Sequence, residues 1–372
     1  MKISAIRTRP VSFPVKQPYV SAQGVRDSAT LVLIEIESDD GFVGIGESVT
    51  SPNYTTTVDI IQAVTADWLG RSPFDISELL ARAKQVHFAA QGASTPRFVQ
   101  RILAGLDMAL WDLVGKHVNR PVYDLLGGRV HEAVTYFSFL QGESVDELCK
   151  SAEQAVNADA PVIYLKIGRG DAFDMSLVAA VRDVIGDRRL RLDPNEAWDT
   201  LTAIRMIRKL ERFEPECIEQ PTPSGSIAAL AHVKRSVSVP ISADQCVYTI
   251  NDVYEVCRQQ AADLIVLGLH EIGGIVPFKK AAAIAEAAGI NICVHGVFES
   301  GITTCASYQA ACTIPNLDDG NQIMWQLLRN DVVASPSLVP ARGKLSLTSQ
   351  PGLGFQLSES IVEASLLALP GS

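Results

Sequence analysis

The sequence predicts an α/β protein in which a small α+β domain precedes a barrel of β/α units. Three observations support this prediction. The N-terminal residues alternate like antiparallel strands, short apolar runs later recur roughly every 20 to 30 residues with amphipathic stretches between them, and charged residues close most of those runs. A spacing of that length is about one β/α unit, which favours parallel strands joined by crossover helices.

The composition is that of a folded, acidic protein. Of the 372 residues, 47% are hydrophobic and 20% are charged, which excludes general disorder and allows a core that needs no disulfides. Lys plus Arg number 32 and Asp plus Glu number 42, so the net charge is −10. No basic block offsets this average, and we therefore expect neither nucleic acid nor a membrane as a partner.

The cysteines and the N-terminus indicate a cytoplasmic protein. The seven cysteines are odd in number and form no Cys-x-x-Cys pair, and several stand in apolar runs such as Ile292-Cys293-Val294. This pattern is typical of reduced, buried thiols. No apolar run reaches the roughly 20 residues of a membrane span, and the N-terminus lacks a secretory signal. We expect a soluble, cytoplasmic protein.

The N-terminal region, residues 1–125, is expected to form an α+β capping domain. Residues 1–15 and 31–38 alternate, and an Asp-Asp-Gly turn leads into FVGIGES, so the three segments predict an antiparallel meander. The polar stretch 16–30 is interpreted as a long loop that could serve as a lid or binding loop. Residues 98–118 place apolar side chains at intervals of three and four, which predicts a helix with a wide buried face.

The second region, residues 126–340, is expected to be the barrel, and the tail, residues 341–372, is expected to return to the first domain. Eight units that close on themselves give a barrel of ordinary size. An open doubly wound sheet is the alternative, but no Gly-rich phosphate loop follows the first run. The runs are VTYFSFLQ (134–141), VIYLKIG (162–168), RLRLDPN (189–195), CIEQP (217–221), ISADQ (241–245), ADLIVLG (262–268), NICVHG (291–296) and a weak NQIMW (321–325).

Three carboxylates end successive runs, at the edge where such a barrel builds its active site. Asp193, Glu219 and Asp244 are 26 and 25 residues apart, so neighbouring strands would bring them together. Carboxylates this close repel one another unless a cation intervenes, and oxygen ligands without Cys or His favour Mg²⁺, with Mn²⁺ as a substitute. Taken singly, each acid could instead be a helix N-cap or a salt-bridge partner.

Two further strand-end residues are candidates for proton transfer. Lys166 lies in an apolar run, where an ammonium is costly unless it points into a polar barrel mouth. A nearby divalent cation would lower the pKa of Lys166 and suit it to proton transfer; the alternative is a structural ion pair with Asp193. His295 is either a second acid/base group or a buried histidine of the core.

An ordered set of motifs contains these residues, and it resembles a known family. The set is GIGES (44–48), AGLDMALWDLVGK (104–116), LLGG (125–128), LKIG (165–168), LDPNEAW (192–198), IEQP (218–221), SADQ (242–245), EIGGI (271–275) and PGLGF (351–355). Over essentially its whole length the chain resembles the mandelate racemase/muconate lactonizing branch of the enolase superfamily, and most closely its muconate-cycloisomerase-like members. The resemblance implies a (β/α)7β barrel, a capping domain built from both chain ends, and a homo-oligomer that is a dimer or an octamer.

The resemblance also implies roles for the strand-end residues. Asp193, Glu219 and Asp244 would bind one Mg²⁺, which stabilises the charge that builds on a substrate carboxylate when its α-proton is removed to give an enediolate. Lys166 stands where the family carries an acid/base group on one face of the substrate. His295 stands where some members carry a base on the opposite face.

Five further residues are implied as contacts of a small carboxylate substrate. Asn195 and Gln245 follow metal-ligand positions and would contact the substrate or support the site. Tyr19, in the predicted cap loop, and Tyr54 would close over the mouth and select the substrate. Tyr164 replaces the first lysine of the family's Lys-x-Lys pair and would offer a neutral hydroxyl instead.

Two more departures from the family pattern concern the sixth and eighth strands. Gly268 stands where muconate-type members carry a lysine and mandelate-type members an aspartate, so His295 is expected to lack the Asp partner that it has in mandelate-type members. The family's eighth-strand glutamate is not evident, and Gln326 is a candidate replacement.

The predicted reaction follows from the number of acid/base groups. Cycloisomerisation of the muconate/lactone type needs one proton donor, which Lys166 supplies, and is therefore the first prediction. If His295 is active, the alternatives are dehydration of an acid sugar or hydroxy acid, and racemisation or epimerisation. An alternative of another class is a barrel that binds a carboxylate without turning it over.

Overall fold

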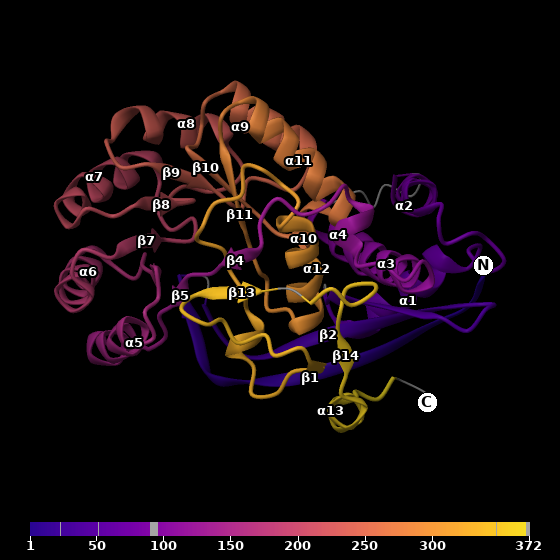
Figure 1. The fold of residues 1–372 in the computed structure, drawn as a ribbon. Helices are drawn as coiled ribbons and strands as arrows, with labels where there is room; N and C mark the ends of the chain where they lie inside the picture. The colour runs from indigo at the N-terminus through magenta and orange to yellow at the C-terminus, as the bar shows by residue number, and fades with distance from the viewer. Residues whose placement is uncertain (23, 51, 90–95, 347, 370–372) are drawn as a thin grey trace.

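The computed structural model of the chain describes residues 1–22, 24–50, 52–89, 96–346 and 348–369. It confirms the predicted fold class, an α/β barrel with an α+β cap. Figure 1 shows the N-terminal sheet along one side of the barrel, and helices around the outside of the barrel strands. Among the described residues, no helix combines the length and the apolar character that crossing a bilayer requires.

The N-terminal meander forms as predicted. Strands β1 (Ile3–Ser21), β2 (Gly24–Ser38) and β3 (Val43–Val49) pair antiparallel in that order. One face of this sheet buries aliphatic side chains against the predicted long helix, α3 (Pro96–His117). The other helical elements of this region are α1 (Tyr54–Thr65), α2 (Ile76–Ala83), the π-helical turn η1 (Lys84–Ala89) and α4 (Val122–Leu125).

The interpretation of residues 16–30 as a loop is wrong, because β1 and β2 continue through them as a hairpin ribbon. The pairing runs from Tyr19 opposite Arg26 to Ser21 opposite Gly24. The first five residues of β2 are all exposed, so this part of the ribbon has no buried face. Strands without a buried face leave no alternating apolar pattern, which is why the sequence does not reveal them.

Seven barrel strands form a parallel sheet in which each strand pairs with its neighbours in chain order. Leu, Ile and Val side chains fill most of the space between these strands and the outer helices. The strands are β5 (Ser138–Phe139), β6 (Val162–Lys166), β7 (Arg189–Asp193), β8 (Cys217–Glu219), β9 (Ile241–Ala243), β10 (Leu264–Leu267) and β11 (Asn291–Val294).

Helices connect these strands, as the alternating pattern predicts. Several begin at side-chain caps that are visible in the sequence; for example, Ser144 and Thr249 each form a capping box with the acid three residues later. The helices are α5 (Val145–Asn157), α6 (Asp171–Ile185), α7 (Thr200–Leu210), α8 (Ile227–Ser236), α9 (Ile250–Arg258), α10 (Leu269–Ile272), α11 (Ile275–Ala287), α12 (Gly301–Ala311) and the 3₁₀ turns η2 (Glu211–Phe213) and η3 (Trp325–Leu327).

Residues 317–322 complete the ring as an eighth strand whose pairing consists of isolated bridges. Leu317 bridges Ile292 of β11, and Asn321 bridges Tyr136, which precedes β5; both bridges are parallel. The predicted eighth run, NQIMW, overlaps only the end of this segment. The ring therefore has the (β/α)7β order that the resemblance implies.

The C-terminal segment contacts both parts of the molecule. Strand β13 (Lys344–Ser346) pairs with β4 (Ala133–Thr135) beside the barrel, and β14 (Gln356–Leu357) pairs with β12 (Val333–Ser335). Beyond helix α13 (Glu359–Ser365) the chain reaches the N-terminal sheet, where the amide of Leu367 donates to the carbonyl of Pro10. Both chain ends thus contribute to the cap.

Buried acids of the cap accept hydrogen bonds at helix starts in the barrel. Glu47 of β3 accepts from the amides of Ser300 (3.1 Å) and Thr303 (2.9 Å) at the beginning of α12. Asp107 of α3 accepts from the amide of Ile275 (2.6 Å), the first residue of α11. Because the first amides of a helix lack partners and carry partial positive charge, these contacts fix the cap to the barrel.

Glycines allow β3 to lie directly against α3. A Cβ atom on Gly46 would lie 2.1 Å from the carbonyl oxygen of Gly105 and 2.7 Å from the amide nitrogen of Ala109. Both of those atoms are backbone, so neither can rotate away. Helix α3 can therefore lie this close to the sheet only because residue 46 is a glycine.

We predict that Gly46→Ala destabilises the protein by about 1–3 kcal/mol, since overpacking moves the backbone of α3. Chemical denaturation measures this change in the free energy of unfolding. Gly225→Ala is the matched control, because a Cβ at Gly225 meets no atom within 4 Å. Equal stability of the two variants would contradict the packing argument.

Candidate active site

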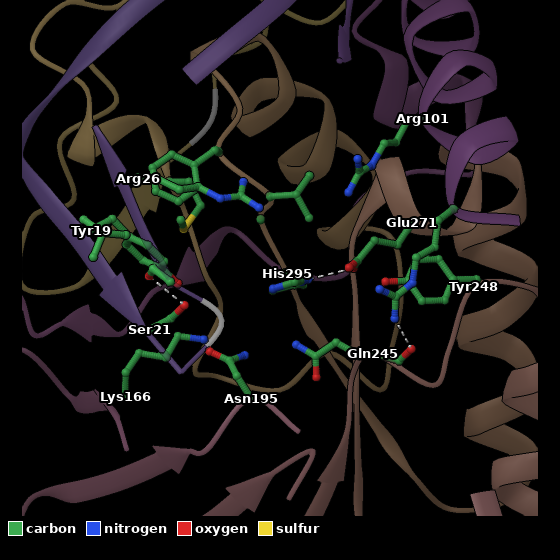
Figure 2. Close-up of a pocket in the computed structure, with 17 residues that line it drawn as sticks. Tyr19, Ser21, Arg26, Arg101, Lys166, Asn195, Gln245, Tyr248, Glu271 and His295 are labelled. Carbon is green, nitrogen blue, oxygen red and sulfur yellow. Dashed lines mark hydrogen bonds and ion pairs between the residues drawn. The ribbon is translucent and has the colours of Figure 1, made fainter. Parts of the chain in front are cut away.

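A cavity of about 300 Å³ opens at the carboxyl ends of the barrel strands (Figure 2). Barrel, ribbon and α3 each contribute to its wall, so the site is shared between barrel and cap. The volume is at the lower end of the range for small-molecule sites. The charged or polar lining residues are Tyr19, Ser21, Arg26, Arg97, Arg101, Lys166, Asn195, Gln245, Tyr248, Glu271 and His295.

Lys166 and Asp193 form a buried ion pair on neighbouring strands. Asp193 is fully buried, and its oxygens also accept from the Tyr164 hydroxyl (2.6 Å) and from Asn195, through the amide (2.6 Å) and through Nδ2 (2.9 Å). Burial is the largest single influence and would lower the pKa of Lys166, but Asp193, Tyr19 and Glu219 together outweigh it, and the pKa is raised. The alternative that the sequence left open, a structural ion pair between Lys166 and Asp193, is therefore present in this structure, and Lys166 is held as an ammonium.

The Tyr164 hydroxyl lies between two of the predicted metal ligands. It is 2.6 Å from Asp193 Oδ2 and 2.7 Å from Glu219 Oε1. A phenol has one proton and can donate it to only one of these oxygens. Burial, and then the charge of Asp193, raise the pKa of Glu219 to about 7. Asp193 and Glu219 therefore cannot both be ionised without a cost in free energy, because too little positive charge lies near them.

Asp244 is the least satisfied acid of the group. It is 1% exposed, and among the described residues neither carboxylate oxygen has a hydrogen-bond donor. The nearest positive group is His295, whose Nδ1 lies 3.4 Å from Asp244 Oδ1. Burial is the main reason that the pKa of Asp244 is raised. A buried carboxylate without donors is costly unless a cation binds it, so this position fits a divalent ion.

His295 has an acidic partner that the sequence did not predict, and it is Glu271 rather than an aspartate at position 268. Its Nδ1 lies 2.7 Å from Glu271 Oε2, which also accepts from the amide of Gly268 at 3.1 Å. A Cβ on Gly268 would lie 3.0 Å from that same oxygen and 3.0 Å from the carbonyl oxygen of His295. The absent side chain at Gly268 thus leaves room for Glu271 to reach the histidine.

The Glu271 contact sets the orientation and charge of His295. Figure 2 shows the imidazole inside the cavity with one edge toward Glu271. Burial alone would lower the pKa of His295, but Asp244 and Glu271 raise it to about 10. A carboxylate that holds Nδ1 also fixes which ring nitrogen faces the substrate.

Within the described parts of the chain, one set of three ligand-type side chains has its ligand atoms within 4.8 Å of one another, and it is Asp244, Glu271 and His295. It shares only Asp244 with the predicted metal set, since Asp193 and Glu219 contact Tyr164 instead. The Nδ1 atom of His295 takes part in both ion pairs, with Asp244 and with Glu271. As a donor to Glu271 that nitrogen has no free lone pair for a metal, which favours a hydrogen-bonded pair over a metal site.

The predicted substrate contacts divide into two groups. Tyr19, Asn195 and Gln245 line the cavity; the ring of Tyr19 packs 5.5 Å from that of Phe139. Tyr54 does not line it, because its hydroxyl donates to the carbonyl of Ala368 at the surface of the cap (3.0 Å).

The predicted replacement for the eighth-strand acid also lies elsewhere. The carbonyl oxygen of Gln326 accepts from Lys16, and Gln326 is absent from the cavity lining described above. Gln322 is nearer the site, since its Oε1 accepts from the amide of Gly296, next to His295 (2.9 Å).

Sequence reasoning missed four residues of the cavity: Arg97, Arg101, Tyr248 and Glu271. Arg97 and Arg101 are one helical turn apart on α3, a spacing that signals a shared helix face but not what the face contacts. Glu271 stands in the EIGGI motif, directly after the sixth strand, and its proximity to a strand end was the available signal.

Comparisons with known proteins agree with this geometry. The family model described as "Mandelate racemase / muconate lactonizing enzyme, N-terminal domain" matches residues 3–127, and the one described as "Enolase C-terminal domain-like" matches residues 147–361. The chain is 30% identical over 376 residues to muconate cycloisomerase 1 of Rhodococcus opacus, with 98% of each chain covered. It is 28% identical to the hydrophobic dipeptide epimerase of Enterococcus faecalis, covering 94% of this chain and 96% of that relative.

A solved structure gives the same result. The crystal structure of the muconate lactonizing enzyme from Pseudomonas fluorescens, complexed with muconolactone, superposes with a TM-score of 0.89 at 30% identity and covers 98% of this chain and 99% of that one. The relatives are cycloisomerases, racemases and epimerases, so the chain is an enzyme of this isomerase group. The predicted resemblance is confirmed, and the chain belongs to the mandelate racemase/muconate lactonizing enzyme family of the enolase superfamily.

Proposed function

We propose that this enzyme racemises or epimerises a small carboxylic acid. One of the two groups Lys166 and His295, in its neutral form, removes the proton α to the carboxylate on one face, and the other, in its protonated form, gives its own proton to the opposite face. The observation that supports this choice is the His295–Glu271 contact of 2.7 Å, which gives the cavity a second oriented acid/base group. With Lys166 alone, cycloisomerisation requires the fewest assumptions. With two groups, proton removal on one face and return on the other becomes available.

The two groups approach the cavity from well-separated strands. Lys166 ends β6 and His295 follows β11. In the ring of eight, β5 and the closing segment separate these strands on one side, and β7 to β10 separate them on the other. A substrate held between them can therefore meet one group on each face, which is what a change of configuration requires.

Asp193, Glu219 and Asp244 would hold the Mg²⁺, because they end three adjacent strands and are buried with too little positive charge nearby. When bound, the ion offsets the negative charge that develops on the substrate carboxylate. Asn195 orients Asp193 through two hydrogen bonds. Tyr164 supplies a proton donor where the family has a lysine, so this part of the site has one fixed positive charge fewer.

Cycloisomerisation is the second candidate, and the relatives favour it. Muconate cycloisomerase 1 is 30% identical over nearly the whole chain, and that reaction needs only the one donor, Lys166. The two candidates differ in what His295 does, and a substitution at that residue separates them.

We predict that Lys166→Ala lowers turnover at least 10³-fold, because proton transfer by a placed group contributes about 10²–10⁴-fold to a rate. Conversion of one substrate epimer into the other, followed by NMR, measures this loss, because turnover needs both groups. Mg²⁺ affinity, measured by calorimetry, should be unchanged or higher, since the substitution frees an oxygen of Asp193. Lys209→Ala, on the exposed side of α7, should behave as the wild type. Full turnover in Lys166→Ala would contradict the assignment of Lys166 as a proton-transfer residue.

We predict that His295→Asn leaves α-proton exchange of one substrate epimer intact and slows exchange of the other at least 10²-fold. The reason is that Lys166 still serves its own face, whereas the opposite face loses its only acid/base group. Exchange measured separately on each epimer tests this. If both epimers exchange at wild-type rates, the racemase proposal is wrong and the one-donor cycloisomerase reading gains support.

We predict that Asp244→Asn stabilises the metal-free protein by about 1 kcal/mol or more at pH 8 and abolishes stabilisation by Mg²⁺. The first effect follows because an unpaired buried carboxylate is removed, and the second because a ligand is lost. Thermal unfolding with and without Mg²⁺ measures both. A variant that is less stable without metal, or that still responds to Mg²⁺, would show that Asp244 does not bind the ion.

A further inference from the structure

We propose that a second cavity, between the cap and the outer helices of the barrel, binds a monocarboxylate with an apolar chain. The carboxylate pairs with Lys84 and Lys280, and the chain lies along the apolar wall. This side cavity is independent of the proposed reaction, because it has no lining residue in common with the cavity at the barrel mouth.

The side cavity lies where the two domains meet. Its lining comes from α2, η1 and α3 of the cap and from α9, α10 and α11 of the barrel. The volume is about 410 Å³, larger than the roughly 300 Å³ of the barrel-mouth cavity and within the range of small-molecule sites. A ligand that fills it therefore contacts cap and barrel at once.

Most of the lining residues are apolar, and both domains supply them. Three of them are not covered by the protein, since Ile250 is exposed and Leu80 and Val276 are only half-buried. Apolar surface that stays in contact with water favours the binding of an apolar group. The large aliphatic side chains of the wall are Ile76, Leu80, Leu103, Ile250, Ile272 and Val276.

The accessible charge in the side cavity is positive. Lys84 and Lys280 line it and are exposed, and within the described part of the chain neither forms a hydrogen bond or an ion pair through its ammonium. The acid of the lining, Asp107, is fully buried and accepts from the amide of Ile275. The protein as a whole has a net charge of −10, so two unpaired cations at one cavity form a local field that attracts anions.

The charge and the wall together identify the ligand class. A lysine ammonium is a flexible point charge that pairs with a carboxylate without one fixed geometry. The aliphatic wall matches a hydrocarbon chain rather than a second polar group. An anionic head on an apolar chain satisfies both features, whereas an inorganic anion leaves the wall in water and an alcohol leaves the lysines unpaired.

The two cavities lie on opposite sides of a thin wall. At three places one residue faces the barrel-mouth cavity and its neighbour in the chain lines the side cavity. Across this wall the Gln100 side chain donates to the carbonyl of Tyr248 (3.0 Å). A ligand in the side cavity therefore contacts the same segments that line the barrel-mouth cavity. The neighbouring pairs are Arg101 and Gln100, Tyr248 and Thr249, and Glu271 and Ile272.

Calorimetric titration tests the proposal with straight-chain monocarboxylates from butyrate to octanoate. The protein is kept in EDTA, so that no metal ion draws the carboxylate to the strand-end acids. We expect the affinity to rise roughly two- to fourfold with each added methylene, because each one buries further apolar surface. Octanol, which lacks the charge, should bind roughly 3- to 10-fold more weakly than octanoate.

Two variants locate the binding site. Ala81→Trp places a large side chain in the cavity from an exposed position of α2 and should lower octanoate affinity at least tenfold. The double variant Lys84→Gln/Lys280→Gln keeps the wall and should bind octanoate no more tightly than octanol. Lys150→Gln is the matched control, since Lys150 is an exposed lysine of α5, and it should bind as the wild type does.

Three results would overturn the proposal. The first is an affinity that does not depend on chain length, or one that neither variant lowers. The second is octanoate binding that Arg101→Gln abolishes and Ala81→Trp leaves intact, which would place the ligand at the barrel mouth. The third is a change of oligomeric mass in Ala81→Trp, measured by light scattering, with unchanged octanoate affinity, which would make the cavity a contact between copies of the chain. None of these results bears on the proposed function, because the titration involves neither Mg²⁺ nor turnover.

Discussion

Buried negative charge at the open end of the barrel is the constraint on which the site depends. Asp193, Glu219 and Asp244 end neighbouring strands, and each is at most 3% exposed. Water cannot solvate them, so the protein must supply protons, donors or cations. Lys166 and Tyr164 do this for Asp193 and Glu219 only in part, and no described residue donates a hydrogen bond to Asp244. The divalent ion of the proposed function would supply the missing positive charge.

The glycine at position 268 and the contact between Glu271 and His295 are connected, and both lie on the side of the cavity opposite Lys166. A side chain at position 268 would crowd Glu271 Oε2, and without it that carboxylate receives the Gly268 amide and holds His295. Losing the sixth-strand base thus makes room for a histidine with an acidic partner. A lysine is a mobile point charge, whereas this histidine has a fixed orientation. Under the proposed function, the exchange would retain an acid/base group on the second face and change its chemical character.

The sequence predicts the parts of this site that repeat with the strands, and it does not predict the parts that depend on tertiary contacts. Lys166, Asp193 and His295 are visible because each ends an apolar run, and the position of a strand end is a local property. The ribbon within residues 16–30 is not evident in the sequence because residues 16–18 and 24–28 are exposed and leave no alternating apolar pattern. Arg101 lines the cavity only because of how α3 docks, which the sequence does not reveal. For the same reason the sequence does not predict that the Tyr54 hydroxyl contacts the C-terminal segment instead of the cavity.

The docking of the cap also sets which ligands can fit. Arg101 is carried by α3, whose position is fixed on one side by the glycine contact with β3 and on the other by the bond from Asp107 to the start of α11. Glu47 makes a similar bond to the start of α12. Each contact has a backbone atom on at least one side, which limits how far α3 can shift. The separation between the Arg101 guanidinium and the strand-end acids is then set by how the cap docks on the barrel.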